Sequence, residues 1–88
     1  MFRLWAKIWK DNRLLDNDVI CNDNGDTRTR KILDALETFC YTYNLGQPIW
    51  LDSTIHTFKH HNRVRFSQDN FMEEISFDYL EIEIIEED

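Results

Sequence analysis

The sequence predicts an α+β fold, in which a small antiparallel or mixed sheet packs on one long helix and one or two short helices. Three observations lead to this prediction. Residues 2–9 and 76–85 alternate in polarity as β-strands do, and residues 26–44 place their apolar side chains on one helical face. A chain of 88 residues with these elements is expected to form a single domain, 1–88, around one hydrophobic core.

The N-terminal segment predicts a β-hairpin. One side of residues 2–9 is entirely apolar, whereas the other side carries cations and indoles. These outward side chains are Arg3, Trp5, Lys7 and Trp9. Residues 10–13 are typical of a tight turn because Asp and Asn tolerate a left-handed backbone, so residues 13–21 are expected to return antiparallel. The polar residues 16–18 interrupt that return, which indicates either a bulge or two shorter strand pieces.

The segment 26–44 predicts the longest helix, because five apolar side chains recur at helical spacing. They are Ile32, Leu36, Phe39, Cys40 and Tyr43. Asp26 or Thr27 can cap its first free N–H groups, and Gly46 and Pro48 follow its end. An isolated helix of this length would be only marginally stable, so its apolar face is expected to pack on the sheet.

The second half of the chain predicts shorter elements. Asp52 and Ser53 can cap a helix over residues 54–61, in which Ile55 and Phe58 would face inward. A brief strand is expected over residues 63–66, and Ser67 can begin one or two helical turns. Arg3 and Lys7 on the first strand and Glu81 and Glu83 on the last have opposite charges, which favours an arrangement in which these two strands pair.

Composition limits the compartment and the partners. The formal net charge of −7 opposes nonspecific binding to nucleic acid and to anionic membranes. No apolar run reaches the roughly 20 residues that a membrane helix needs, and charges interrupt the N-terminal segment too often for a signal peptide. Cys21 and Cys40 are expected to be reduced thiols. We therefore expect a cytoplasmic protein without membrane contact.

The outward side of the first strand is the main candidate for binding a partner. Trp is enriched at the centres of interfaces, and an unpaired sheet edge can add a strand from another chain. Arg3, Trp5, Lys7 and Trp9 therefore predict contact with a protein partner or with a second copy in a homodimer. An alternative is cover by the chain's own helix or loop, and a further one is stacking of single-stranded nucleic acid on the indoles, which the acidic charge makes unfavourable.

Two other sets of residues are candidate sites. His56 and His60 lie four positions apart, a spacing that can bind a transition metal, but residues 56–60 read HTFKH and no further ligand completes a familiar pattern. Arg63 and Arg65 lie in a basic segment that could bind an anion, or that could instead compensate nearby acidic residues. No phosphate-binding glycine loop, catalytic motif or calcium loop is present, so no cofactor is expected.

The two ends of the chain carry a resemblance. Residues 1–15, MFRLWAKIWKDNRLL, and 77–88, FDYLEIEIIEED, resemble short uncharacterised cytosolic proteins of Gram-positive bacteria, for which no function is established. The resemblance implies a cytosolic compartment and a single-domain size, and it implies no residue roles. The leading hypothesis is a non-enzymatic protein-interaction module that self-associates. The alternatives are a nucleic-acid-associated accessory or regulatory protein and a metal-dependent enzyme that uses His56 and His60.

Overall fold

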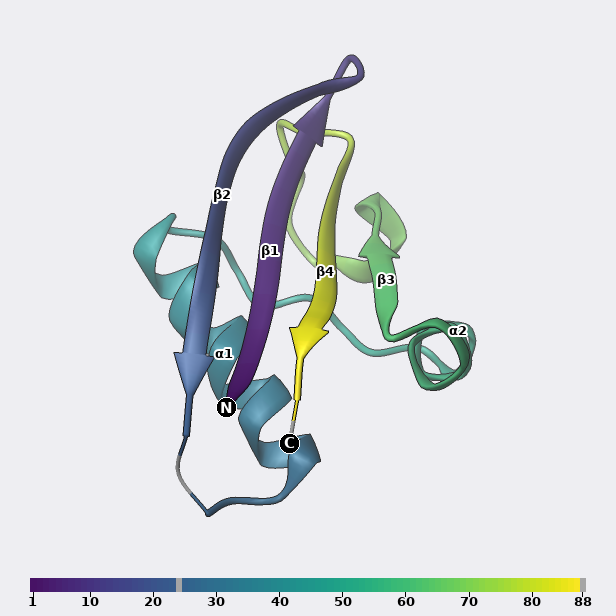
Figure 1. The fold of residues 1–88 in the computed structure, drawn as a ribbon. Helices are drawn as coiled ribbons and strands as arrows, with labels where there is room; N and C mark the ends of the chain where they lie inside the picture. Colours follow the sequence, from purple (N-terminus) through teal and green to yellow (C-terminus); the bar gives the residue numbers. More distant parts are fainter. Residues whose placement is uncertain (24, 88) are drawn as a thin grey trace.

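The chain folds as the α+β arrangement that the sequence predicts, with α-helices packed against a four-stranded sheet (Figure 1). The computed structural model describes residues 1–23 and 25–87. Its elements in chain order are β1 (Phe2–Lys10), β2 (Arg13–Asn22), α1 (Arg28–Thr42), α2 (Asp52–His61), β3 (Arg63–Phe66), the 3-10 helix η1 (Gln68–Asn70) and β4 (Tyr79–Glu86). No helix within the described ranges is long and apolar enough to cross a lipid bilayer.

The sheet has the strand order β2-β1-β4-β3, and each neighbouring pair is antiparallel. The C-terminal strand lies beside the N-terminal strand, as the opposite charges on the two segments predicted. Lys7 pairs with Glu81 and Trp5 pairs with Glu83 in the register of β1 and β4. The two ends of the chain are consequently close together (Figure 1).

The N-terminal hairpin is confirmed, and its turn has a clear cause. Asp11 and Asn12 both have positive φ angles, 52° and 63°, which is the backbone that a two-residue hairpin turn requires. The register shifts between Ile8 and Trp9, so that Leu15 is an extra residue in β2. Of the two predicted possibilities, the bulge is therefore correct and the interrupted strand is wrong, because β2 continues through residues 16–18.

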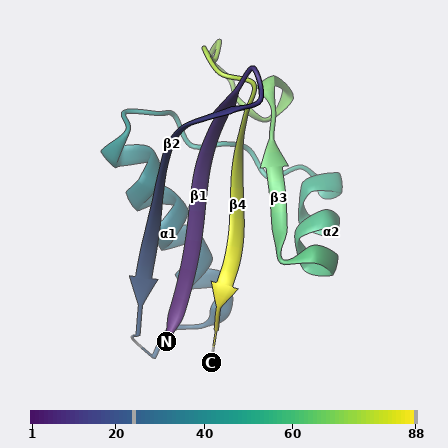
Figure 2. The same cartoon turned by 45° about the horizontal axis from the view of Figure 1, so that its top comes forward.

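The core lies between the sheet and α1. The side chains of Phe2, Leu4, Ala6 and Ile8 are buried on the inner face of β1, as the alternation predicted. Most of the predicted apolar face of α1 is buried against them, and Tyr43 packs at its margin. Figures 1 and 2 show α1 behind β1 and β2, and α2 beside β3 at the other edge.

The ends and faces of the two helices agree with expectation in part. Thr27 caps α1, because its Oγ1 accepts a hydrogen bond from the Arg30 amide at 3.2 Å, and the helix is slightly shorter than residues 26–44. In α2, Phe58 is buried as predicted, but Ile55 is exposed and Thr54 is buried in its place. The buried Thr54 hydroxyl accepts a hydrogen bond from Asn70 of η1 at 3.1 Å, which satisfies the polar group on the inward face of α2.

Candidate functional site

One face of the sheet carries no helix, and we call it the open face (Figure 2). It is the side of the sheet opposite α1, and its residues follow from the register, since directly paired residues of an antiparallel sheet point to the same side. The open face comprises Arg3, Trp5, Lys7, Trp9, Leu14, Asn17, Val19, Cys21, Arg63, Arg65, Tyr79, Glu81, Glu83 and Glu86. The four predicted partner-binding residues thus share one surface with the predicted anion-binding pair.

An ion-pair network occupies the centre of the open face. Lys7 Nζ lies 3.0 Å from Glu83 Oε1 and 3.4 Å from Glu81 Oε1. Arg65 Nε donates to the other oxygen of Glu81 at 3.2 Å. The side chains of Lys7 and Glu81 are each only 8% exposed, so this charge pair is held largely away from water. Burial of a charge is costly unless it is paired, and here both members have partners.

The two indoles flank this network, and both are half-buried. Trp9 Nε1 donates a hydrogen bond to Glu81 Oε1 at 3.2 Å, and Trp5 Nε1 donates to Asn17 Oδ1 at 3.1 Å. Lys7 Nζ lies 3.8 Å from the centroid of the Trp5 ring, which adds a cation–π contact. The polar ends of both indoles are therefore satisfied within the chain, whereas part of each ring still meets solvent.

The hydrogen bonds at Glu81 have an electrostatic consequence. Burial alone would raise the pKa of Glu81, but the hydrogen bond from Arg65, the charge and hydrogen bond of Lys7 and the hydrogen bond from Trp9 together hold it below its ordinary value of 4.5. A carboxyl group whose pKa is lowered by folding stabilises the folded state at pH values above the pKa that the group has in the unfolded chain. That contribution is lost as the pH falls through the lowered folded pKa.

We therefore expect stability to decrease on acidification below pH 4.5, and part of this decrease to depend on Glu81. Urea unfolding at pH 7 and at several lower pH values measures it. The Glu81→Gln variant should be less stable at pH 7 and should lose less stability than wild type over the acidic range. An equal loss in both proteins would show that Glu81 does not contribute.

The free edge of β2 is partly closed by side chains. Because the register directs Asp16, Asp18 and Ile20 to β1, the backbone groups of Asn17 and Val19 point outward. The Tyr43 hydroxyl donates to the Asn17 carbonyl at 3.3 Å, and the Val19 amide donates to Asp18 Oδ1 at 2.9 Å. Strand addition at the hairpin edge, one of the predicted routes to self-association, is therefore obstructed.

The open face nevertheless keeps apolar area beside the indoles. Leu14 and Val19 lie opposite Trp9 and Trp5 in the register, and each is 40% exposed. Trp5 with Val19 and Trp9 with Leu14 form two apolar patches on β1 and β2, and Lys7 and Asn17 lie between them. The available contact on this face is therefore packing of side chains onto a partner surface.

The two predicted anion-binding residues differ in their surroundings. Arg65 bonds to Glu81, and its guanidinium lies 4.5 Å from the centroid of the Tyr79 ring. Arg63 has no ion pair within residues 1–23 and 25–87, since Glu83, which faces it in the register, bonds to Lys7. Only Arg63 is thus an uncompensated cation on this part of β3.

The histidine pair lies away from the open face, on α2. The ring centroids of His56 and His60 are 4.4 Å apart, as expected for two residues on one side of a helix. Among the described residues, no third His, Cys, Asp or Glu joins them in a group that could hold a metal ion. The structure therefore brings together the predicted pair and adds no ligand to it.

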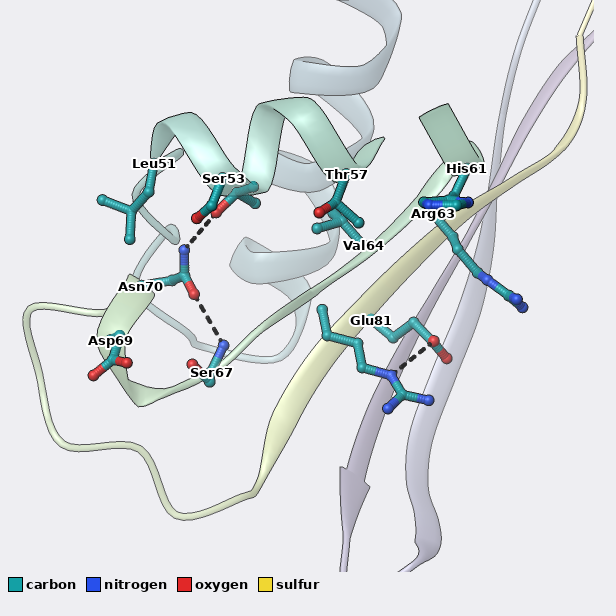
Figure 3. A pocket seen from close by; sticks show the side chains of 12 residues that line it. Leu51, Ser53, Thr57, His61, Arg63, Val64, Ser67, Asp69, Asn70 and Glu81 are labelled. Atoms are coloured by element: carbon teal, nitrogen blue, oxygen red, sulfur yellow. Dashed lines mark hydrogen bonds and ion pairs between the residues drawn. The ribbon is translucent and has the colours of Figure 1, made fainter. Parts of the chain in front are cut away.

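A cleft of about 640 Å³ lies between α2 and β3 (Figure 3). Asn70 fixes one end of it. Its Nδ2 donates to the Ile49 carbonyl at 3.0 Å and to Thr54 Oγ1, and its Oδ1 accepts from the Ser67 amide at 3.1 Å. Asn70 is not among the site residues predicted from the sequence; the spacing of Ser67 and Asn70, which form a capping box around η1, is the signal that points to it.

Both cysteines are unpaired thiols, Cys21 on the surface and Cys40 in the core. Burial raises the pKa of Cys40 to about 11, which makes this thiol an inert packing group rather than a nucleophile.

No family model matches the chain, and no curated protein or solved structure matches it either.

Proposed function

We propose that this protein is a non-enzymatic protein-interaction module that associates with a second copy of itself through the open face. The observation that supports this most directly is the helix-free sheet surface on which Trp5 and Trp9 remain partly exposed beside Val19 and Leu14. Aromatic side chains with satisfied polar ends and exposed ring area are typical of interface centres.

Charge complementarity favours a second copy as the partner. Cations and carboxylates are interspersed on the open face, where Arg3 pairs with Glu86 at 2.9 Å and Lys7 pairs with Glu83. A surface that carries both signs can be complementary to itself across a two-fold axis. The chain as a whole has a net charge of −7, so the contact must depend on this local pattern rather than on overall charge.

The two alternative functions have weaker support. A nucleic-acid-associated accessory or regulatory protein would need free cations beside the indoles, but Lys7 and Arg65 are already bonded to Glu83 and Glu81. A metal-dependent enzyme would need further ligands beside His56 and His60.

We also propose a cytoplasmic location, which the two unpaired cysteines support. The relation to short cytosolic proteins of Gram-positive bacteria stays a prediction.

The test is the solution mass of the wild-type chain and of a Val19→Glu variant, measured by light scattering over a range of protein concentrations. We expect wild type to reach twice the mass of one chain and Val19→Glu to remain monomeric, because a carboxylate would be buried against an apolar partner surface. The substitution should leave the fold intact, since Val19 is 40% exposed on an edge strand.

Leu33→Glu is the matched control, because Leu33 is similarly exposed, at 44%, but lies on α1 behind the sheet. It adds the same charge and should dimerise like wild type. A Trp5→Ala, Trp9→Ala double variant should also be monomeric. A monomeric wild type at every concentration would refute self-association, and equal weakening by Val19→Glu and Leu33→Glu would refute the open face as its location.

A further inference from the structure

The edge of the sheet at β3 differs from the edge at β2, because its outward backbone groups have no partners. The Ile84 amide donates to the Asn62 carbonyl at 2.9 Å, and alternate residues of an antiparallel strand face the same neighbour. Val64 and Phe66 therefore bond to β4, whereas Arg63 and Arg65 direct their N–H and C=O groups away from the sheet. In residues 1–23 and 25–87, no backbone or side-chain group bonds to these outward groups.

These unpaired groups border the cleft between α2 and β3 (Figure 3). The α2 side of the cleft presents Ser53, Thr57 and His61, which recur at one-turn spacing, and the strand side presents Arg63 and Arg65. Its volume of about 640 Å³ is within the range of ligand-binding clefts. The cleft therefore combines a strand edge that can accept backbone hydrogen bonds with an opposite wall that can contact side chains.

We propose that this cleft binds an extended acidic peptide segment of another protein, which adds to the sheet as a strand beside β3. Strand addition supplies affinity through backbone hydrogen bonds, here to Arg63 and Arg65, and specificity through alternate side chains. The unpaired guanidinium of Arg63 selects a carboxylate on the peptide. This inference does not rest on the proposed self-association, which uses side chains of β1 and β2 rather than the backbone of β3.

The structure also explains why the peptide would choose this edge. At β2, Tyr43 bonds to the outward carbonyl of Asn17 and Asp18 bonds to the outward amide of Val19, whereas at β3 no described side chain bonds to an outward backbone group. Asn70 holds η1, the loop at Ile49 and α2 in fixed relation, so one end of the cleft is formed before any ligand binds. A preformed site loses less entropy when it binds a peptide.

The test begins with selection of phage-displayed random heptapeptides on the full chain, followed by synthesis of the strongest binder. We expect the selected peptides to have acidic residues that alternate with β-branched residues. Arg65→Pro removes the outward N–H without breaking a bond to β4, because proline is tolerated where an edge N–H faces outward. Arg65→Ala is its matched control, because it loses the same side chain and keeps the N–H. Arg65→Pro should bind the peptide roughly tenfold more weakly than Arg65→Ala.

Amide hydrogen exchange of the wild-type chain gives a result that does not depend on the proline variant folding. The Arg63 and Arg65 amides should exchange quickly in the free protein and slowly with the peptide, whereas the Val64 amide should be protected in both. Three results would overturn the proposal: no selected peptide, equal binding by the two Arg65 variants, or protection elsewhere in the chain. Concentration-dependent protection of Arg63 and Arg65 without peptide would also overturn it, because the occupant would then be a second copy.

Discussion

Replacing Lys7 with Met is expected to lower the free energy of unfolding by about 3 kcal/mol, because removal of one member of a buried ion pair leaves the other member with too little compensating charge. Glu81 would keep the hydrogen bond from Arg65, but its Oε1 would lose the ion pair with Lys7 Nζ at 3.4 Å. Urea unfolding at pH 7 measures the loss directly. In a domain of this size, it corresponds to a decrease in Tm of roughly 12 to 24 °C.

A second variant separates the ion pair from simple packing. In Lys7→Met, Glu81→Leu, both buried charges are replaced by apolar side chains, so the remaining cost should be smaller than in Lys7→Met alone. Glu83 and Arg65 can then be hydrated, because their side chains are 29% and 63% exposed. The free-energy cost of Glu81→Leu alone is the reference. If the double variant is less stable than Lys7→Met by that whole amount, then the two residues are not coupled and the network contributes little.

Replacing Asn70 with Leu is expected to destabilise the fold by about 2 to 3 kcal/mol, because three polar groups lose their partners at once. These groups are the Ile49 carbonyl, the Thr54 hydroxyl and the Ser67 amide. Thr54 is itself buried, so its hydroxyl has little access to water as a substitute. Chemical denaturation gives the change in stability, and amide exchange shows whether α2 opens before the sheet does.

Asp69→Leu provides the control for Asn70→Leu. Asp69 is the neighbouring residue in η1 and is exposed, so the same replacement should change the stability by no more than about 0.5 kcal/mol. Asn70→Asp keeps the acceptor for the Ser67 amide but places a buried carboxylate oxygen against the Ile49 carbonyl, so it should destabilise the fold at least as much as Asn70→Leu. Similar stabilities for Asn70→Leu and Asp69→Leu would contradict a role of Asn70 in holding the cleft together.

Several parts of the fold could be predicted because they depend on neighbouring residues alone. Alternation in residues 2–9 identified both the buried face of β1 and the face that carries Trp5 and Trp9. Helical spacing identified α1, and the turn residues Asp11 and Asn12 identified the hairpin. Even the pairing of β1 with β4 was accessible, because the charges at Lys7 and Glu81 are complementary whatever the connection between the two strands.

The sequence by itself determined the strands, the long helix and the two faces of β1, since periodicity and turn chemistry act within a few residues. Only the tertiary structure decided the contacts that set the surface properties. Three contacts of this kind join segments that are distant in the chain: the ion pair of Lys7 with Glu81, the hydrogen bond of Tyr43 to the β2 edge at Asn17, and the hydrogen bond of Asn70 to Thr54 at the cleft. Such contacts depend on strand register and on the packing of helices against the sheet, and local sequence patterns do not specify either one.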